Sequence, residues 1–187
     1  QCTEQALKLD PADASLWGNY GNVLRDLGEL EASLQAFGEG LKRAPGNWGL
    51  LQGQAISLAR LGRHQQIVDL LTPQVEQQAP AGGSNALADL LLELGNAHHA
   101  LGQMERALAC WQRGAHSAEG EKRLFIGLNT AQVLCDRKQY KEAQTLCGGL
   151  EPLFPQNANL IYAQGVIARG LGDLQTAYGL FERALQL

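Results

Sequence analysis

The chain has 187 residues and a formal net charge of −4, with 45% apolar and 18% charged residues. An acidic balance without a basic stripe argues against a protein that holds nucleic acid or anionic lipid, so we expect no nucleic-acid partner. No apolar run approaches the roughly 18 residues of a membrane-spanning helix, so we expect no membrane insertion.

A recurring Leu-Gly dipeptide indicates that the chain is built from repeats. It occurs at residues 27–28, 61–62, 101–102 and 171–172, which gives gaps of 34, 40 and 70 residues. A gap of 70 residues holds two units of about 35, and the pair Arg137-Lys138 stands where the intermediate unit would have its Leu-Gly. The spacing therefore predicts five units.

Taken in chain order, the units predict five pairs of antiparallel helices, because apolar residues recur three and four positions apart. Residues 1–13 are expected to end an earlier helix, and the pairs to occupy residues 14–47, 48–87, 88–123, 124–157 and 158–187. The first pair should have helices over 14–27 and 30–43.

Two irregularities interrupt this regular order. Residues 77–84 lengthen the second unit by six residues, which predicts a longer second helix or a protruding loop. The fifth unit stops within its second helix, and a stack of repeats needs polar ends. We therefore expect this sequence to be an excerpt from a longer protein.

Small residues have two expected roles in these helix pairs. Gly28, Gly62, Gly102 and Gly172 follow the first helix of a pair, where a left-handed conformation favours glycine. A second set lies where the two helices of a pair should cross and lets their backbones approach, namely Gly21, Ala55, Gly95, Ala131 and Gly165.

The spacing of these residues resembles the tetratricopeptide repeat motif, W-x2-L-G-x2-Y followed by A-x3-F and P. The clearest matches are Trp17, Tyr20, Gly21, Phe37 and Pro45 in the first unit, Leu91, Leu94, Gly95, Ala107 and Trp111 in the third, and Gly165, Ala168, Ala177 and Phe181 in the fifth. The resemblance covers about residues 14–187. It implies an all-α fold, a right-handed superhelical solenoid of about five helix-turn-helix units.

The resemblance also implies a concave groove that binds a protein or peptide, lined by the first helix of each pair. The larger side chains carried over to it are Asn19, Asn22, Arg25, Gln52, Asp89, Leu92, Glu93, Asn96, His99, Phe125, Leu128, Asn129, Gln132, Asn159, Tyr162, Val166 and Arg169. The remaining positions carried over to the groove are Ser15, Gly18, Gly49, Gly53, Ile56, Ala59, Cys135 and Ala163.

Seven aromatic residues separate into two groups by position. Trp17, Tyr20, Phe37, Trp111 and Phe181 match packing positions of the motif, and we expect them in the core. Phe125 and Tyr162 do not, and with Leu92, Leu128 and Val166 they predict an exposed apolar strip of the kind that binds partners. The alternative is that a loop or a further unit covers this strip. Asp89 and Glu93 would favour a ligand with a Lys or Arg beside its apolar anchor.

Two known uses of such grooves can be compared with these positions. Co-chaperones hold the tail of heat-shock chaperones with a carboxylate clamp, and here the inner Asn96 and Asn129 remain while every clamp cation is replaced, which argues against that partner. The first unit is similar to repeats of O-linked N-acetylglucosamine transferases, which carry a ladder of inward asparagines. That ladder is kept only at Asn19 and Asn129.

Residue patterns of catalytic and metal sites are missing from the sequence. No Lys follows a Gly and no His precedes a Glu, which excludes a phosphate-binding loop and the H-E-x-x-H zinc motif. His98-His99 would diverge on a helix, with His98 in a core position. The cysteines have no C-x-x-C spacing and are expected to pack as small apolar residues. We expect no catalytic residue, no metal and no cofactor, and a cytoplasmic protein, since no signal sequence opens the chain.

Three functions remain open at this point. The first is a protein-interaction module that binds a peptide or a partner helix in its groove. The second is the substrate-recognition arm of a multidomain enzyme, such as a glycosyltransferase, whose catalytic domain lies outside this chain. The third is a structural spacer or a scaffold that associates with itself, so a homo-oligomer is a further possible partner. Fold alone does not choose between them.

Overall fold

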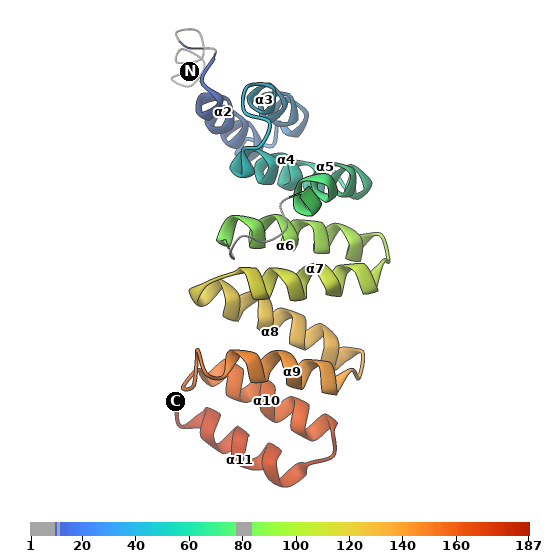
Figure 1. The fold of residues 1–187 in the computed structure, drawn as a ribbon, viewed down its shortest axis with the longest axis vertical. Helices are drawn as coiled ribbons and strands as arrows, with labels where there is room; N and C mark the ends of the chain where they lie inside the picture. Colours follow the sequence, from blue (N-terminus) through green and yellow to red (C-terminus); the bar gives the residue numbers. More distant parts are fainter. Residues whose placement is uncertain (1–9, 11, 78–83) are drawn as a thin grey trace. The chain divides into compact units, whose positions relative to one another are not determined.

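The computed structural model describes residue 10 and residues 12–77 and 84–187, and these form ten helices and no strand (Figure 1). The helices are α2 (Ala14–Asp26), α3 (Leu30–Arg43), α4 (Trp48–Arg60), α5 (His64–Gln77), α6 (Asn85–Ala100), α7 (Met104–Ser117), α8 (Gly120–Asp136), α9 (Tyr140–Leu150), α10 (Ala158–Gly170) and α11 (Leu174–Leu185). The predicted all-α fold of paired helices is confirmed. No described helix is long and apolar enough to cross a bilayer.

Two predictions fall outside the described residues. These are the end of an earlier helix before residue 10 and the conformation of residues 78–83 in the long second connection. The proposed repeat boundaries stay a prediction. Two first helices begin ahead of them, α6 at Asn85 before the boundary at 88 and α8 at Gly120 before the boundary at 124.

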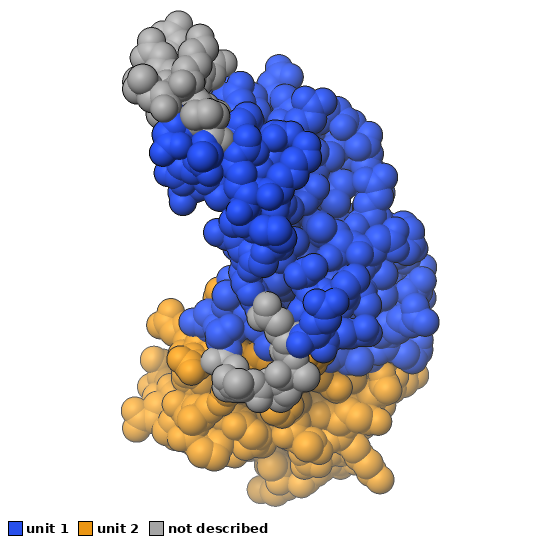
Figure 2. All heavy atoms as spheres, turned by 45° about the horizontal axis from the view of Figure 1, so that its top comes forward, with its two compact units in different colours: residues 1–110 blue, residues 111–187 orange. Residues whose placement is uncertain are grey.

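The chain divides into two compact units, Gln1–Cys110 and Trp111–Leu187, which Figure 2 distinguishes by colour. In the first unit α2 packs on α3 and α4, and α4 packs on α5 and α6. In the second unit α8 packs on α9 and α10, and α10 packs on α9 and α11. The first helices α2, α4 and α8 therefore each contact the second helix of their own pair and the first helix of the next pair, which places α8 beside α10.

The ends of the first helices are fixed by local side chains and by backbone conformation. The side chains of Asp13, Asn47, Ser84 and Asn157 each accept a hydrogen bond from a backbone N–H in the first turn. The glycines at 28, 62, 102 and 172 have φ between +70° and +87°, as predicted. Lys138 takes the equivalent place after α8 with φ of 60°, so the chain keeps the turn there without a glycine.

Phe37 fills the centre of the first helix pairs. Its ring is 1% exposed, and a Cβ added at Gly53 would lie closer than 3.0 Å to it. A Cβ at Gly21 would be 3.0 Å from the same ring. The glycines of α2 and α4 thus form the two walls around a ring from α3. Nearby, the buried hydroxyl of Ser33 donates a hydrogen bond to the carbonyl of Gly21 at 2.8 Å, so this buried polar group has a hydrogen-bond partner.

In the second unit, glycines also allow close packing against a neighbouring side chain at three places. A Cβ at Gly127 would collide with Leu150, one at Gly165 with the ring of Phe181, and one at Gly170 with the ring of Tyr140. The last contact joins the end of α10 to the start of α9. It is therefore a contact between successive repeats, whereas Gly165 and Phe181 lie within one pair.

The expected aromatic core is only partly correct. Phe37 and Trp111 are buried, but Trp17, Tyr20 and Phe181 are half-buried. The reason is position along the stack, because within the described residues α2 and α11 each pack against helices on one side. The Trp17 ring is covered instead by the guanidinium of Arg43, 5.0 Å from its centroid.

Candidate functional site

Residues predicted to line the groove meet at a cavity between α8 and α10. The cavity has a volume of about 240 Å³. Its lining residues are Leu128, Asn129, Ala131, Gln132, Cys135, Asn159, Tyr162, Ala163 and Val166. All but Ala131 are groove positions taken from the sequence. The two first helices α8 and α10 contact each other, and about two turns of each bring these residues together.

The lining of this cavity carries no charged side chain. The amides of Asn129 and Asn159 are exposed and make no hydrogen bond to any described residue. Gln132 donates from its Nε2 to a carboxylate oxygen of Asp136 at 2.8 Å, which leaves its own amide oxygen facing solvent. The site therefore offers donors and acceptors of neutral amides rather than an ion pair.

Two aromatic rings face solvent on these helices: Tyr162 lines the cavity, and Phe125 lies one turn before Leu128 on α8. Phe125 is 59% exposed and Tyr162 is 58% exposed. Tyr162 also contacts Phe181 of α11, with ring centroids 5.5 Å apart and planes tilted by 48°. Tyr162 is exposed, as expected of the apolar strip, and its ring also has a packing contact with Phe181. A ring held in this way is pre-organised for a ligand.

The thiol of Cys135 lies on the groove, and the thiol of Cys147 lies beneath it. Burial raises the pKa of Cys147 to about 12, with a further contribution from the nearby Cys135 thiol. Burial, and then the charge of Asp136, raises the pKa of Cys135. A raised pKa favours the neutral thiol over the thiolate, which is the nucleophilic form of cysteine. The described cysteines form no disulfide.

The remaining predicted residues of the second unit flank the cavity. Leu128 and Val166 are half-buried and face it, so they and Tyr162 supply its apolar surface. Arg169 is exposed near the end of α10, one turn beyond Val166. Its guanidinium makes no hydrogen bond or ion pair with a described residue.

In the first unit the predicted groove residues lie on α2 and α4. Asn19 and Asn22 are exposed, and Gln52 is half-buried. Arg25 differs from the expectation of a groove-facing cation, because its guanidinium is largely buried and lies 5.9 Å from the centroid of Phe37. Arg25 therefore packs against Phe37, and little of its charged group is exposed on the groove side of α2.

The five predicted residues of α6 also belong to the first unit. Asn96 and His99 are exposed, whereas Asp89, Leu92 and Glu93 are half-buried. Burial, and then the charge of Asp89, raises the pKa of Glu93. The neighbouring His98 is buried as predicted, and its Nδ1 is 2.8 Å from the side-chain oxygen of Gln103. Leu92 on α6 belongs to the first unit, and Phe125 on α8 belongs to the second.

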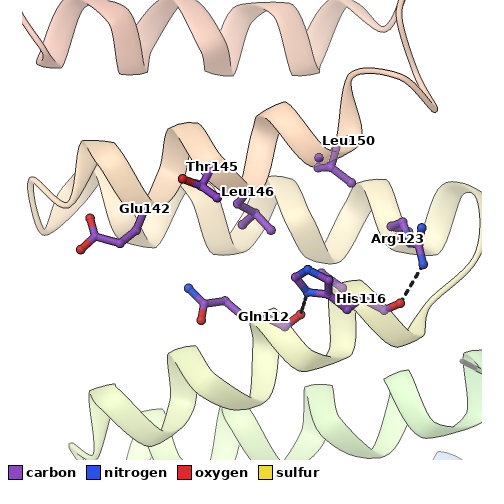
Figure 3. A pocket seen from close by; sticks show the side chains of 9 residues that line it. Gln112, His116, Arg123, Glu142, Thr145, Leu146 and Leu150 are labelled. Carbon is purple, nitrogen blue, oxygen red and sulfur yellow. Dashed lines mark hydrogen bonds between the residues drawn. The ribbon is translucent and has the colours of Figure 1, made fainter. Parts of the chain in front are cut away.

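A second cavity of the second unit was not predicted from the sequence. It has a volume of about 350 Å³ and lies between α9, the end of α7 and the start of α8 (Figure 3). Its lining residues are Gln112, Ala115, His116, Arg123, Glu142, Thr145, Leu146, Gly149 and Leu150. We call it the α7–α9 cleft. No described group of three His, Cys, Asp or Glu side chains could hold a metal ion.

The protein was compared with solved structures. YrrB, described as a TPR protein with an unusual peptide-binding site, is 18% identical with a TM-score of 0.66, over the whole of this chain and 92% of that one. MamA is 17% identical with a TM-score of 0.68, over 92% and 90%. PilF of Pseudomonas aeruginosa is 16% identical with a TM-score of 0.71, over 95% and 78%. At these identities the likeness shows the fold alone.

Sequence comparisons give the family. A segment of 76 residues is 28% identical to Superkiller protein 3 of Saccharomyces cerevisiae, and it spans 41% of this chain but only 5% of that protein. The sequence model of the tetratricopeptide repeat matches residues 1–147, most of the chain. Proteins built from this repeat are generally non-catalytic modules that bind other proteins. With its helix pairs and its positive-φ turns, the chain belongs to the tetratricopeptide repeat family.

Proposed function

We propose that this protein is an interaction module and that the groove between α8 and α10 binds an extended peptide with an apolar anchor residue. One observation carries the proposal. The lining of the groove combines an exposed ring, apolar side chains and two unpartnered asparagine amides around one uncharged cavity. Apolar surface at the centre with polar groups beside it is the arrangement of binding hot spots.

The chemistry of the lining defines the ligand. An asparagine amide both donates and accepts, so Asn129 and Asn159 can each bond the N–H and C=O of an extended backbone without reading its side chains. The cavity of about 240 Å³ is smaller than the roughly 300–1,000 Å³ of small-molecule sites, which fits one or two side chains. The anchor would lie against Leu128, Tyr162 and Val166.

The contact between Tyr162 and Phe181 supports this use of the groove. A side chain already held in place loses less conformational freedom when a ligand arrives. Burying the exposed part of two aromatic rings also supplies hydrophobic free energy at roughly 25 cal/mol per Å² of apolar surface. The absence of charge in the lining favours a ligand whose contacting residues are neutral.

The test changes the two exposed rings together. Phe125→Ala with Tyr162→Ala is expected to weaken a partner by about a hundredfold or more, since hot-spot aromatics contribute about 2 kcal/mol or more each. The ligand would come from a pull-down in the source cell and then be mapped to a peptide for anisotropy titration. Tyr178→Ala is the matched control, because that ring is 63% exposed on α11 and does not line the groove.

Three outcomes distinguish the possibilities. Loss of binding with an unchanged melting temperature supports the groove. If the double variant binds as tightly as the wild type, the groove between α8 and α10 is not the site. If the double variant loses helicity while the Tyr178→Ala variant does not, the two rings stabilise the fold and the proposal is wrong.

A further inference from the structure

The α7–α9 cleft exists because one repeat lacks a side chain at a position where the others have one. Gly149 lies eleven residues after the positive-φ residue Lys138. Eleven residues after the positive-φ glycines at 28, 62, 102 and 172, which follow the first helices of the other pairs, stand Glu39, Pro73, Arg113 and Arg183. No atom lies within 4 Å of a Cβ added at Gly149, so close packing does not require a glycine there.

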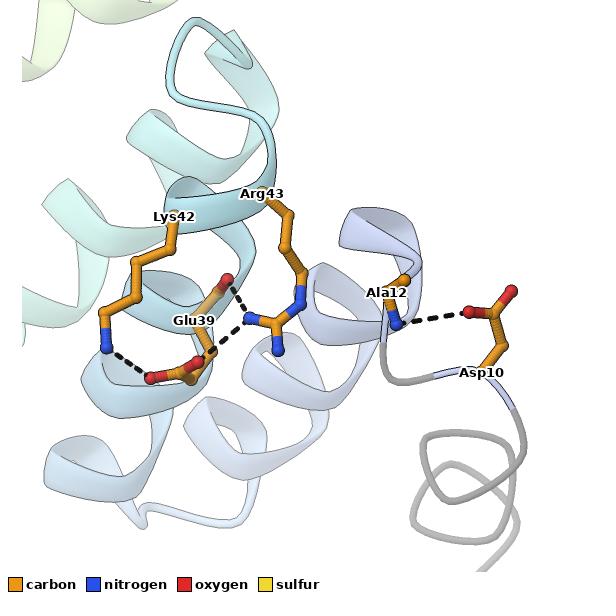
Figure 4. Close-up of polar contacts among 5 residues, drawn as sticks. All are labelled: Asp10, Ala12, Glu39, Lys42 and Arg43. Carbon is orange, nitrogen blue, oxygen red and sulfur yellow. Dashed lines mark hydrogen bonds and ion pairs between the residues drawn. The ribbon is translucent and has the colours of Figure 1, made fainter.

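In two other repeats the side chain at the position of Gly149 makes polar contacts. The carboxylate of Glu39 lies across its own helix and accepts from Nζ of Lys42 at 2.6 Å and from Nη1 of Arg43 at 2.9 Å (Figure 4). Arg183 reaches back and donates to the carbonyl of Pro155 at 2.7 Å. A glycine weakens a helix relative to alanine, and Gly149 places no side chain beside Leu146, which is half-buried and lines the cleft.

One end of the cleft holds an anchored cation. Nε of Arg123 donates to the carbonyl of Ala118 and Nη2 donates to the carbonyl of His116, both at 2.7 Å. These bonds fix the guanidinium at the end of α7, and its Nη1 makes no hydrogen bond to any described residue. A fixed guanidinium with a spare N–H group is suited to accept a carboxylate.

The other groups of the cleft determine in which orientation a ligand would bind. Nδ1 of His116 is 2.8 Å from the carbonyl oxygen of Gln112, to which it donates, so Nε2 stays available to a ligand. Glu142 lies at the opposite end from Arg123 in Figure 3. A ligand carboxylate is therefore attracted at the Arg123 end and repelled at the Glu142 end.

We propose that the α7–α9 cleft is a second binding site, which takes a partner segment with a large apolar side chain beside an acidic side chain. The apolar side chain packs on the exposed part of Leu146, and the carboxylate bonds Nη1 of Arg123. His116, Glu142, Thr145 and Gly149 at the rim are exposed, so a small molecule would stay open to water. A bound protein segment, in contrast, would itself shield the cleft from water. This site is separate from the groove between α8 and α10.

The test uses short N-acetylated, C-amidated peptides on an array, in which Leu or Phe and Glu are fixed at varying spacing in a Gly-Ser background. We expect retained peptides to combine the apolar residue with the acid, and Glu→Gln in the peptide to weaken binding by about tenfold. Retention of basic or neutral peptides instead would overturn the proposal. So would peptides that bind only with a free C-terminal carboxylate, or no peptide that binds more tightly than about 1 mM.

Variants of the protein locate the bound peptide. Gly149→Leu is expected to fill the cleft, to raise or keep the melting temperature, and to weaken binding by at least tenfold. Gly148→Leu is the control, because Gly148 lies on the same helix, has the same open surroundings and does not line the cleft. Binding that survives Gly149→Leu overturns the proposal. Tyr162→Ala should leave this binding unchanged, which separates this test from that of the groove.

Discussion

The burial of Phe37 between Gly21 and Gly53 allows a stability prediction with an internal control. Phe37→Ala removes a ring that is 1% exposed, and a buried Phe→Ala change costs about 3–5 kcal/mol. The ring also lies beneath the guanidinium of Arg25 at 5.9 Å, a contact worth about 0.5–1 kcal/mol. The two glycines have no side chains that could close over the space, so we expect the upper part of the range.

Phe125→Ala is the matched control, because it makes the same chemical change at a ring that is 59% exposed. We expect it to change the free energy of unfolding by about 0.5 kcal/mol or less. Both variants would be unfolded in urea and followed by circular dichroism. Hydrogen exchange would then show whether the loss of protection is concentrated in α2, α3 and α4. Equal costs for the two variants, or a cost below about 1 kcal/mol for Phe37→Ala, would refute this account of the core.

Three further changes test other parts of the fold. Trp111→Ala is expected to cost about 3–5 kcal/mol in urea unfolding, because the ring is only 7% exposed, and a near-neutral result would place it at the surface. Lys138→Gly should raise stability by about 1 kcal/mol, because φ of 60° strains a residue with a Cβ, and a lower melting temperature would contradict this. The raised pKa of Glu93 means that its contribution to stability is full below its ordinary pKa of 4.5 and is lost as pH rises through its folded-state pKa. Glu93→Gln should therefore raise the melting temperature at neutral pH, with a difference that vanishes below pH 4.5, and equal melting at neutral pH would argue against burial of the charge.

The repeat and its turns could be predicted from the sequence because they depend on residues close together along the chain. The interval between Leu-Gly pairs gave the number of helix pairs, and it located Lys138 as a turn residue without a glycine to mark it. The positions facing the groove on α8 and α10 also follow from the periodicity of one helix. They needed no knowledge of how the helices cross.

Contacts between helices could not be predicted in the same way. Two such contacts are that of the Tyr162 ring with Phe181 and that of the Arg25 guanidinium with the Phe37 ring. Both depend on the crossing angles of the helices and on side-chain rotamers. The α7–α9 cleft was missed because its cause is an absent side chain, and Gly149 by itself has the appearance of any helical glycine. Comparison with Glu39 and Arg183, counted from the turn, was the signal that could have found it.

The contact of Gly170 with the ring of Tyr140 ties the shape of the groove to a residue outside it. In a repeat protein each layer touches only its neighbours, so the angle between successive layers is set by such contacts. A side chain at 170 would act as a wedge between α10 and α9. Tyr162 lies about two turns earlier on α10, so the wedge would shift it relative to Leu128 on α8. If the groove binds a peptide as proposed, substitutions at 170 would thus tune its width, and with it the preferred anchor residue, without altering any residue that lines it.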